Sequence, residues 1–202
     1  MDTHLKAYVI NLDRRPERMV SFNKNKFPFE VERVSAVETM DGSMGCNLSH
    51  LAILKHQKEF PFVIFEDDYV MVEPWSTVEK AIEQLPPTWD ALWLGATLDT
   101  PIKRYSDNLY LLKKAYCTHG IIYNSPEIVD YVLKELPKFL ATTKGKKIID
   151  VFYYEQVQEI FDCFITYPMC ALQAEGYSDI MKRTPGLDEH QWRLDCYDKF
   201  TK

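Results

Sequence analysis

The sequence of 202 residues predicts one α/β domain, in which helices flank a mixed, mainly parallel sheet. Short apolar segments alternate with amphipathic segments through the first half, and this alternation is typical of parallel sheets. The segment Phe62–Phe65 contains only large apolar residues, as expected of a strand buried on both faces. A chain of this length can bury a sizeable core as a single domain.

The other strands are predicted from β-branched and aromatic residues bounded by turn residues. They are Leu5–Ile10, Val31–Val37, Asp90–Leu94, Leu109–Leu112, Tyr116–Tyr123 and Cys163–Tyr167. Lys113 and Lys114 separate two of these segments, which suggests an antiparallel hairpin in the second half of the chain.

Helices are predicted where apolar residues recur with helical spacing or where proline follows a capping residue. They are Arg14–Lys26, Asn47–Phe60, Pro74–Leu85, Ser125–Leu140 and Asp150–Phe161. The polar segments Glu38–Met44 and Thr97–Asp107 are predicted as loops.

Composition excludes several classes of protein. The formal charge of −6 argues against nucleic acid as the main partner, because phosphate backbones attract basic surfaces. The five cysteines include no C-x-x-C pair, which argues for reduced thiols rather than a zinc site of that type. No segment is long and apolar enough to span a bilayer, and the first twelve residues lack the features of a signal peptide. We therefore expect a cytoplasmic protein with at most peripheral membrane contact.

Three acidic residues, Glu66, Asp67 and Asp68, follow the apolar segment directly. In open α/β sheets, ligands bind beyond the carboxyl ends of the strands. Three carboxylates there would raise one another's pKa unless a cation lay among them, and oxygen ligands suit Mg²⁺ or Mn²⁺. The sequence therefore predicts a divalent metal, and through it a phosphate, at this strand end. The alternative is that the acidic residues only end a strand and start a turn.

Polar residues also follow the first strand. The chain has neither a G-x-G-x-x-G nor a P-loop motif, so dinucleotide-binding and P-loop folds are not expected. Asn11 and Asp13 offer an amide and a carboxylate for a base and ribose, while Arg14 and Arg15 offer guanidinium groups for a diphosphate. The alternative is an ordinary strand end followed by surface arginines.

Three blocks, Asn11–Arg18, Gly45–His50 and Phe65–Asp68, resemble in order the signature blocks of glycosyltransferase family 25. That family includes bacterial lipooligosaccharide galactosyltransferases and the collagen galactosyltransferases. Weaker similarity continues to about Ile180, so the resemblance covers most of the chain.

The resemblance implies a GT-A fold in a single domain, residues 1–202. Residues 1–95 would form the half that binds the nucleotide-sugar, and residues 96–202 the half that binds the acceptor. It also implies a metal-dependent, inverting transfer from a UDP-sugar, most often UDP-galactose, to a glycan or other hydroxyl acceptor. Mn²⁺ or Mg²⁺ would be the cofactor, and would stabilise the UDP leaving group as a Lewis acid.

Within this scheme the acidic residues take different roles. Side chains alternate along an extended chain, so Glu66 and Asp68 face one way and Asp67 the other. Asp68 is therefore predicted as a direct metal ligand, with Glu66 beside it or acting through water. Asp67 is predicted to face the ribose or the donor sugar.

The second block is predicted to contact the donor at the start of a helix. Gly45 permits close backbone approach, and a helix N-terminus favours anions. Asn47, Ser49 and His50 are the predicted contacts to donor sugar or phosphate. Cys46 is expected to pack rather than to act as a nucleophile.

Single-step inversion needs a carboxylate base on the acceptor hydroxyl. Asp150 is predicted for this role; the alternative is a plain helix N-cap. Residues with secondary assignments are the reserve bases Glu155 and Asp179, the candidate third metal ligands His119 and His190, and the candidate acceptor platform Trp192.

Two other functions fit parts of the sequence. The acidic strand end also resembles the first strand of response-regulator receivers, although in those domains it opens the chain. The second alternative is a catalytically degenerate protein that binds a UDP-sugar or a glycan without turnover.

Overall fold

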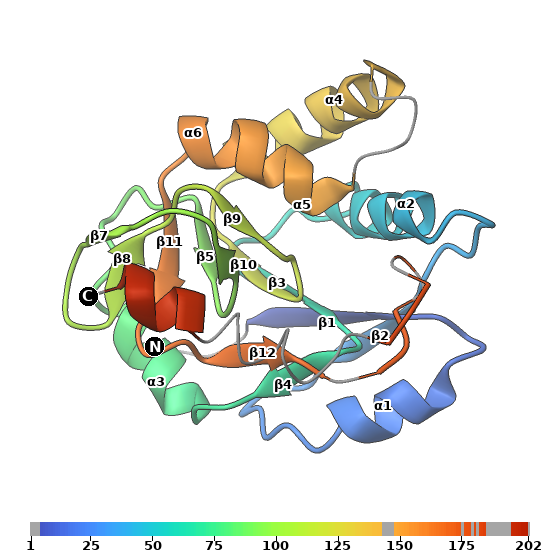
Figure 1. The fold of residues 1–202 in the computed structure, drawn as a ribbon, viewed down its shortest axis with the longest axis horizontal. Helices are drawn as coiled ribbons and strands as arrows, with labels where there is room; N and C mark the ends of the chain where they lie inside the picture. Colours follow the sequence, from blue (N-terminus) through green and yellow to red (C-terminus); the bar gives the residue numbers. More distant parts are fainter. Residues whose placement is uncertain are drawn as a thin grey trace.

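The computed structural model describes residues 5–142, 148–174, 176–178, 180, 182–184 and 195–201. An eight-stranded sheet with strand order β2-β1-β3-β10-β5-β11-β8-β7 forms its centre (Figure 1). The strands of this sheet are β1 Lys6–Asn11, β2 Glu32–Ser35, β3 Phe62–Glu66, β5 Ala91–Trp93, β7 Lys103–Arg104, β8 Leu109–Leu111, β10 Gly120–Tyr123 and β11 Cys163–Thr166. Strands β8 and β10 run opposite to the other six. The predicted mixed α/β architecture is confirmed.

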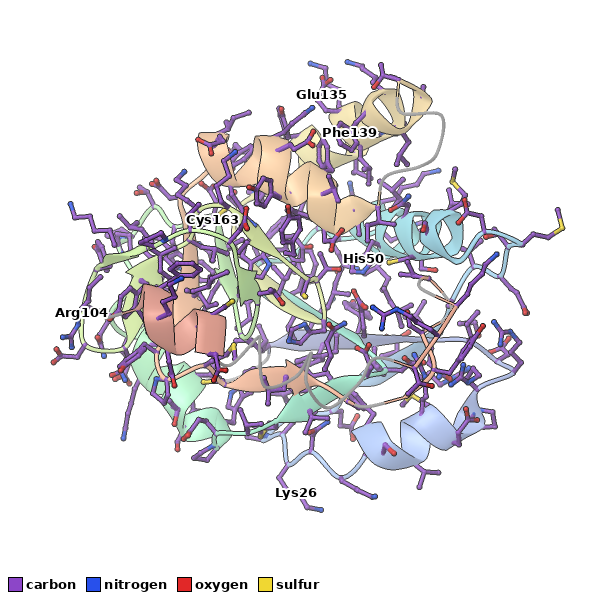
Figure 2. The ribbon with its side chains drawn as sticks, in the orientation of Figure 1. Lys26, His50, Arg104, Glu135, Phe139 and Cys163 are labelled. Carbon is purple, nitrogen blue, oxygen red and sulfur yellow. The ribbon has the colours of Figure 1, made fainter. Side chains whose placement is uncertain are left out.

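Helices cover both faces of the sheet. On one face lie α2 Gly42–Leu54, α4 Pro126–Thr142 and α5 Ile149–Phe152, and on the other lie α1 Pro16–Phe22 and α3 Trp75–Ile82 (Figure 1). Figure 2 shows the charged side chains of Lys26, Arg104 and Glu135 at the periphery of this assembly. None of the described helices is both long and apolar enough to cross a membrane.

The apolar strand β3 lies in the middle of the core, as predicted. All four residues Phe62–Phe65 are completely buried. Ile64 belongs to the cluster under α2 and α4, whereas Phe65 packs with Phe22 and Trp75 on the opposite face. A strand covered on both faces requires apolar side chains in both directions, which is why its sequence does not alternate.

Two small sheets flank the main one. β4 Tyr69–Met71 pairs antiparallel with β12 Ala171–Gln173, and β6 Thr97–Leu98 pairs with β9 Ala115–Tyr116. The first pair brings the C-terminal part of the chain beside the acidic end of β3. The second shows that the predicted loop Thr97–Asp107 is partly wrong, because Thr97 and Leu98 are buried and paired.

The predicted hairpin between Leu109–Leu112 and Tyr116–Tyr123 is wrong. β8 pairs with β7 and β11, while β10 lies between β3 and β5. Local sequence could not show this, because the partners of both strands are distant in the chain. The regions 1–95 and 96–202 therefore interleave in one sheet.

Two helix boundaries also differ from prediction. Helix α2 begins at Gly42 rather than Asn47, because the side chain of Asp41 caps it by accepting a hydrogen bond from Ser43 N at 3.0 Å. Consequently Gly45–His50 lies inside the helix, not at its N-terminus. Helix α1 ends at Phe22, well before the predicted end at Lys26.

The predicted helix Asp150–Phe161 contains a π-helical turn. It consists of α5, then η1 Tyr153–Val157, then α6 Gln158–Ile160. Completely buried Gln158 donates through Nε2 to the carbonyl of Ala115 at 2.8 Å and accepts from its N–H at 2.9 Å. This amide therefore fixes β9 against the helical segment that carries Asp150.

We predict that Gln158→Ala lowers the free energy of unfolding by about 2–4 kcal/mol, because both backbone groups of Ala115 lose their partner in a buried position. Urea unfolding measures the change. The matched control is Glu159→Ala at the neighbouring exposed position, where loss of the surface ion pair with Lys114 should cost less than about 1 kcal/mol. Equal stability of the two variants would contradict the assignment.

Candidate functional site

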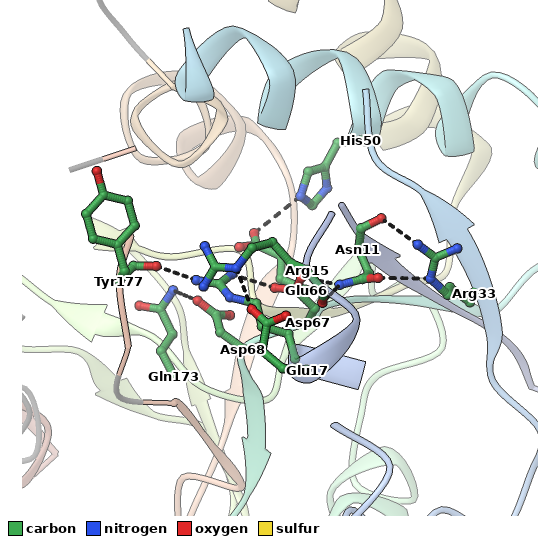
Figure 3. Close-up of polar contacts among 11 residues, drawn as sticks. Asn11, Arg15, Glu17, Arg33, His50, Glu66, Asp67, Asp68, Gln173 and Tyr177 are labelled. Atoms are coloured by element: carbon green, nitrogen blue, oxygen red, sulfur yellow. Dashed lines mark hydrogen bonds and ion pairs between the residues drawn. The ribbon is translucent and has the colours of Figure 1, made fainter. Parts of the chain in front are cut away.

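The polar ends of three parallel strands meet at one edge of the sheet. The register pairs Ile10 with Glu66 and Asn11 with Ser35. Side chains that follow β1, β2 and β3 therefore lie together beyond the carboxyl ends of the strands, where ligands bind in open α/β sheets. Figure 3 shows this group of polar contacts.

Asn11 holds the group together from a buried position. Its Nδ2 donates to Asp67 Oδ2 at 2.7 Å and to the carbonyl oxygen of Arg15 at 3.0 Å. Its Oδ1 accepts from Arg33 Nε at 2.9 Å. Because the amide is engaged on both sides within the protein, Asn11 positions its neighbours rather than presenting a free edge to a nucleotide.

Asp67 forms an ion pair with Arg18. Arg18 Nη1 lies 2.7 Å from Asp67 Oδ1, and Arg18 Nη2 donates to the carbonyl oxygen of Tyr177 at 2.6 Å. Burial raises the pKa of Asp67, and the Arg18 charge and the Asn11 hydrogen bond act against this rise. Arg18 was not among the predicted site residues, although it belongs to the block Asn11–Arg18 and lies on α1.

Glu66 is held by two residues on the opposite side. Its Oε1 accepts from Thr118 Oγ1 at 2.5 Å and lies 3.3 Å from Nε2 of the completely buried His50. Burial alone would raise the pKa of Glu66. The hydrogen bonds from His50 and Thr118, with the charges of His50 and His119, outweigh burial and leave this pKa below its usual value.

Asp68 has a third set of contacts. Its Oδ2 accepts from Gln173 Nε2 at 3.2 Å, and its carbonyl accepts from Ala174 N at 2.6 Å. Because β3 ends at Glu66 and the chain turns at Asp67, strand alternation does not extend through all three acidic residues. Each carboxylate contacts different side chains instead.

Two residues of the block Gly45–His50 fix α2 against the chain that follows β2. A Cβ atom on Gly45 would lie 2.6 Å from the carbonyl oxygen of Val37, so only glycine fits. Ser49 Oγ accepts from Val37 N at 2.8 Å and donates to the Gly45 carbonyl at 2.6 Å. The close approach predicted for Gly45 is thus to the protein's own backbone.

Asn47 faces the start of α5. It is completely buried, and its Oδ1 accepts from Ile149 N at 2.7 Å. This bond satisfies one of the N–H groups that a helix leaves unpaired in its first turn. Asn47 therefore supports the helix that carries Asp150.

Asp150 lies in the first turn of α5 and is not the N-cap, which is Ile148. The alternative of a plain N-cap is therefore wrong. Burial raises the pKa of Asp150 to about 6, and the charge of Glu66 raises it further, while backbone groups of Val151 and Cys117 lower it. Its buried Oδ1 accepts no hydrogen bond from the described residues.

One cavity collects most of the predicted site. The predicted residues that line it are Arg14, Gly45, Ser49, His50, Glu66, Asp67 and Asp68. Arg18 and Gln173, which were not predicted, also line it. Sequence reasoning had no signal for Thr118, which contacts Glu66 from a segment 52 residues away.

The other predicted residues lie outside the described lining of this cavity. They are Asn11, Asp13, Arg15, Asn47 and Asp150. Asp13 is exposed and pairs with Arg33 at 2.6 Å, and Arg15 pairs with Glu17 at 2.6 Å. These two ion pairs engage both side chains with residues that are also outside the described lining of the cavity.

The secondary candidates fall in three places. His119 is buried, and its charge contributes to the pKa of Glu66. Glu155 is exposed on η1. Asp179, His190 and Trp192 lie outside the described residues.

Comparisons with known proteins give weak likenesses only. No family model matches the chain, and no curated protein sequence matches it. The crystal structure of A197 from STIV is 12% identical with a TM-score of 0.48, covering 89% of this chain and 92% of that chain. A nucleoside-diphosphate-sugar pyrophosphorylase from Vibrio cholerae RC9 is 13% identical with a TM-score of 0.37, covering 78% and 70%.

A third solved structure, the inositol-1-phosphate CTP transferase from T. maritima, is 11% identical with a TM-score of 0.41. That alignment covers 98% of this chain and 78% of that chain. At such scores the likenesses carry no argument about what this chain binds, so its function has to be argued from its own residues.

We predict that Asn11→Asp makes stability depend on pH. The new carboxylate would lie 2.7 Å from Asp67, where the amide now donates, so the pair would retain a proton and have a raised pKa. A raised folded-state pKa favours the fold below the unfolded value and loses that effect as pH rises. Relative to wild type, the variant should lose at least about 1–3 kcal/mol between pH 4 and pH 7.

Urea unfolding of both proteins across this pH range measures the difference. The matched control is Asn23→Asp at an exposed position just after α1, where an added charge should change stability by less than about 1 kcal/mol. A pH-independent difference for Asn11→Asp would show that Asn11 and Asp67 do not interact as described.

Proposed function

We propose that the chain is a metal-dependent, inverting glycosyltransferase of the family 25 type, with UDP-galactose as the first donor to test. The observation that carries this proposal is the convergence of the acidic turn 66–68 with Arg14 and Arg18 at one cavity. Separate anionic and cationic groups at one site suit a metal-bound nucleoside diphosphate.

A divalent cation fits the acidic turn chemically. Carboxylate oxygens of Glu66 and Asp68 line the cavity, and oxygen ligands suit Mn²⁺ or Mg²⁺. Burial raises the pKa of the Cys46 thiol, and the negative charges of Glu66, Asp150 and Asp68 raise it further, as expected of a region favourable to a cation. When bound, the ion would supply Lewis-acid stabilisation of the UDP leaving group.

The arginines supply the diphosphate side of the site. Arg14 and Arg18 both line the cavity, and the planar guanidinium group suits bidentate phosphate contacts. Asp67 holds Arg18 in place, so we assign Asp67 to positioning this arginine beside the donor. The exposed Asp13, whose Oδ1 accepts from Arg33 and Ser35, is the proposed contact to a ribose hydroxyl.

Asp150 is the proposed base. An acceptor hydroxyl attacks the anomeric carbon as the bond from that carbon to the UDP oxygen breaks, and Asp150 takes the hydroxyl proton. A pKa of about 6 leaves the carboxylate mostly ionised at neutral pH and still basic enough to accept this proton. The bond from Asn47 to the first turn of α5 fixes the helix that presents it.

One observation favours a second candidate, a protein that binds a UDP-sugar without turnover. Glu66 Oε1 already contacts Thr118 and His50, which reduces its capacity to hold a metal. Isothermal titration with UDP-galactose, combined with a UDP-release assay in Mn²⁺, separates the two functions. Donor binding with no Mn²⁺-dependent release across several donors and acceptors would favour the binding protein.

We predict that Asp68→Ala lowers Mn²⁺-dependent UDP release by at least about 100-fold, because a metal ligand is lost. Thermal unfolding should show that the variant retains its fold. The matched control is Asp130→Asn, an exposed position on α4, which should keep the wild-type rate. A near-normal rate for Asp68→Ala would refute the metal assignment.

We predict that Asp150→Asn binds UDP-sugar with unchanged affinity but transfers no sugar. In the wild type, kcat/KM should rise with pH through about 6, because only the ionised carboxylate accepts a proton. Steady-state rates between pH 5 and 8, and donor titration of the variant, test both points. Wild-type transfer by Asp150→Asn would exclude Asp150 as the base.

A further inference from the structure

A thiol, an imidazole and a carboxylate converge at the inner end of the cavity. Cys46 and His50 are four residues apart on α2 and so share one face of the helix, which meets the end of β3 at Glu66. The Cys46 sulfur, an imidazole nitrogen of His50 and a carboxylate oxygen of Glu66 lie within 4.8 Å of one another. Across the described ranges of the chain, no other group of three such residues meets this condition.

We propose that Cys46, His50 and Glu66 bind Zn²⁺. Sulfur and nitrogen ligands select zinc over the hard cations that oxygen ligands select. This site therefore differs in chemical class from the Mn²⁺ or Mg²⁺ site proposed at Glu66 and Asp68.

The spacing of the groups suits a tetrahedral ion. With Zn–N and Zn–O bonds of about 2.0–2.1 Å and a Zn–S bond of about 2.3 Å, neighbouring N and O ligands lie about 3.3 Å apart, and S and N about 3.6 Å. His50 Nε2 and Glu66 Oε1 already lie 3.3 Å apart. The Cys46 sulfur lies within 4.8 Å of the other two ligand atoms. To reach the spacing of a tetrahedral site it must move toward them by at most about 1.2 Å, which rotation about the Cys46 side-chain bond can supply.

Two buried polar atoms in this region lack a hydrogen-bond partner among the described residues. His50 is completely buried, yet within the described structure its Nδ1 has no hydrogen-bond partner, and neither has Oδ1 of Asp150. Most buried polar atoms in proteins have a partner. The described residues therefore do not satisfy every buried polar atom of these side chains.

The local charge also favours a cation that can displace a proton from the thiol. Burial raises the pKa of the Cys46 thiol, and the negative charges of Glu66, Asp150 and Asp68 add to this rise. A free thiolate is thus disfavoured, whereas zinc binding exchanges the thiol proton for the metal. We therefore expect zinc affinity to increase as pH rises.

Zinc and the hard cation would share Glu66. Occupation of the zinc site would remove Glu66 from the proposed Mn²⁺ site, so zinc would inhibit transfer. This consequence rests on the proposed function. The zinc site itself does not, because metal binding can be measured without turnover.

The test uses the reduced, chelator-treated full chain, titrated first with Co²⁺ and then with Zn²⁺. Tetrahedral Co²⁺ bound to a thiolate gives a near-ultraviolet charge-transfer band and intense visible bands. We expect one equivalent of Co²⁺ to produce both, and Zn²⁺ to abolish them. Cys46→Ala should lose the charge-transfer band and weaken Zn²⁺ binding by at least about 100-fold.

Two further variants separate this site from its surroundings. The matched control Cys196→Ala alters a half-buried thiol in the helix 195–200 and should keep both the spectrum and the affinity. Asp68→Ala, which should abolish transfer, should retain zinc binding, so the two proposals can fail separately. Thermal unfolding verifies each fold, and Glu66→Gln provides a second ligand variant should Cys46→Ala not fold.

The absence of a charge-transfer band at one equivalent of Co²⁺ would overturn the proposal. An unchanged Zn²⁺ affinity in Cys46→Ala, or in Glu66→Gln if that variant replaces it, would overturn it equally.

Discussion

The buried amide of Asn11 is the interaction on which the described site depends. At the end of β1 it reaches three separate segments, through Asp67, Arg33 and the carbonyl of Arg15. Polar groups at a buried sheet edge must find partners inside the protein, and here one side chain satisfies a carboxylate, a guanidinium and a backbone carbonyl together. Arg18 then approaches Asp67 from α1. The cationic and anionic sides of the cavity are thus fixed relative to each other.

Glu66 lies at the end of β3, between the side chains of the two proposed metal sites. On one side lie oxygen groups of the acidic turn, and on the other lie the imidazole of His50 and the thiol of Cys46. If both proposed sites bind metal, hard and soft cations would compete for this one carboxylate. Its contact with Thr118 holds Glu66 between these two sets of side chains.

Sequence alone predicted what depends on local pattern. The strand Phe62–Phe65 was recognisable because a strand covered on both faces must be apolar in both directions. The prediction of a hairpin was wrong because β10 pairs with β3 and β5. The pattern of residues within a strand does not identify partners that are distant in the sequence. The alternation of side chains along a strand could not assign the contacts of Glu66, Asp67 and Asp68, because the chain turns at Asp67. The π-helical turn after Asp150 and the role of Thr118 likewise arise from tertiary contacts that leave no local signal.

The insertion of β10 between β3 and β5 has a consequence for the chain during synthesis. At roughly 5–20 residues per second, the ribosome needs about 3–11 s after completing β3 to reach β10. During that interval the most apolar strand has one open edge, and open apolar edges pair with other chains. The hydrogen bond from Arg18 to the carbonyl of Tyr177 can form only later still, because the two residues are 159 positions apart in the sequence. In the nascent chain, β3 therefore lacks one of its two partner strands until β10 has been synthesised.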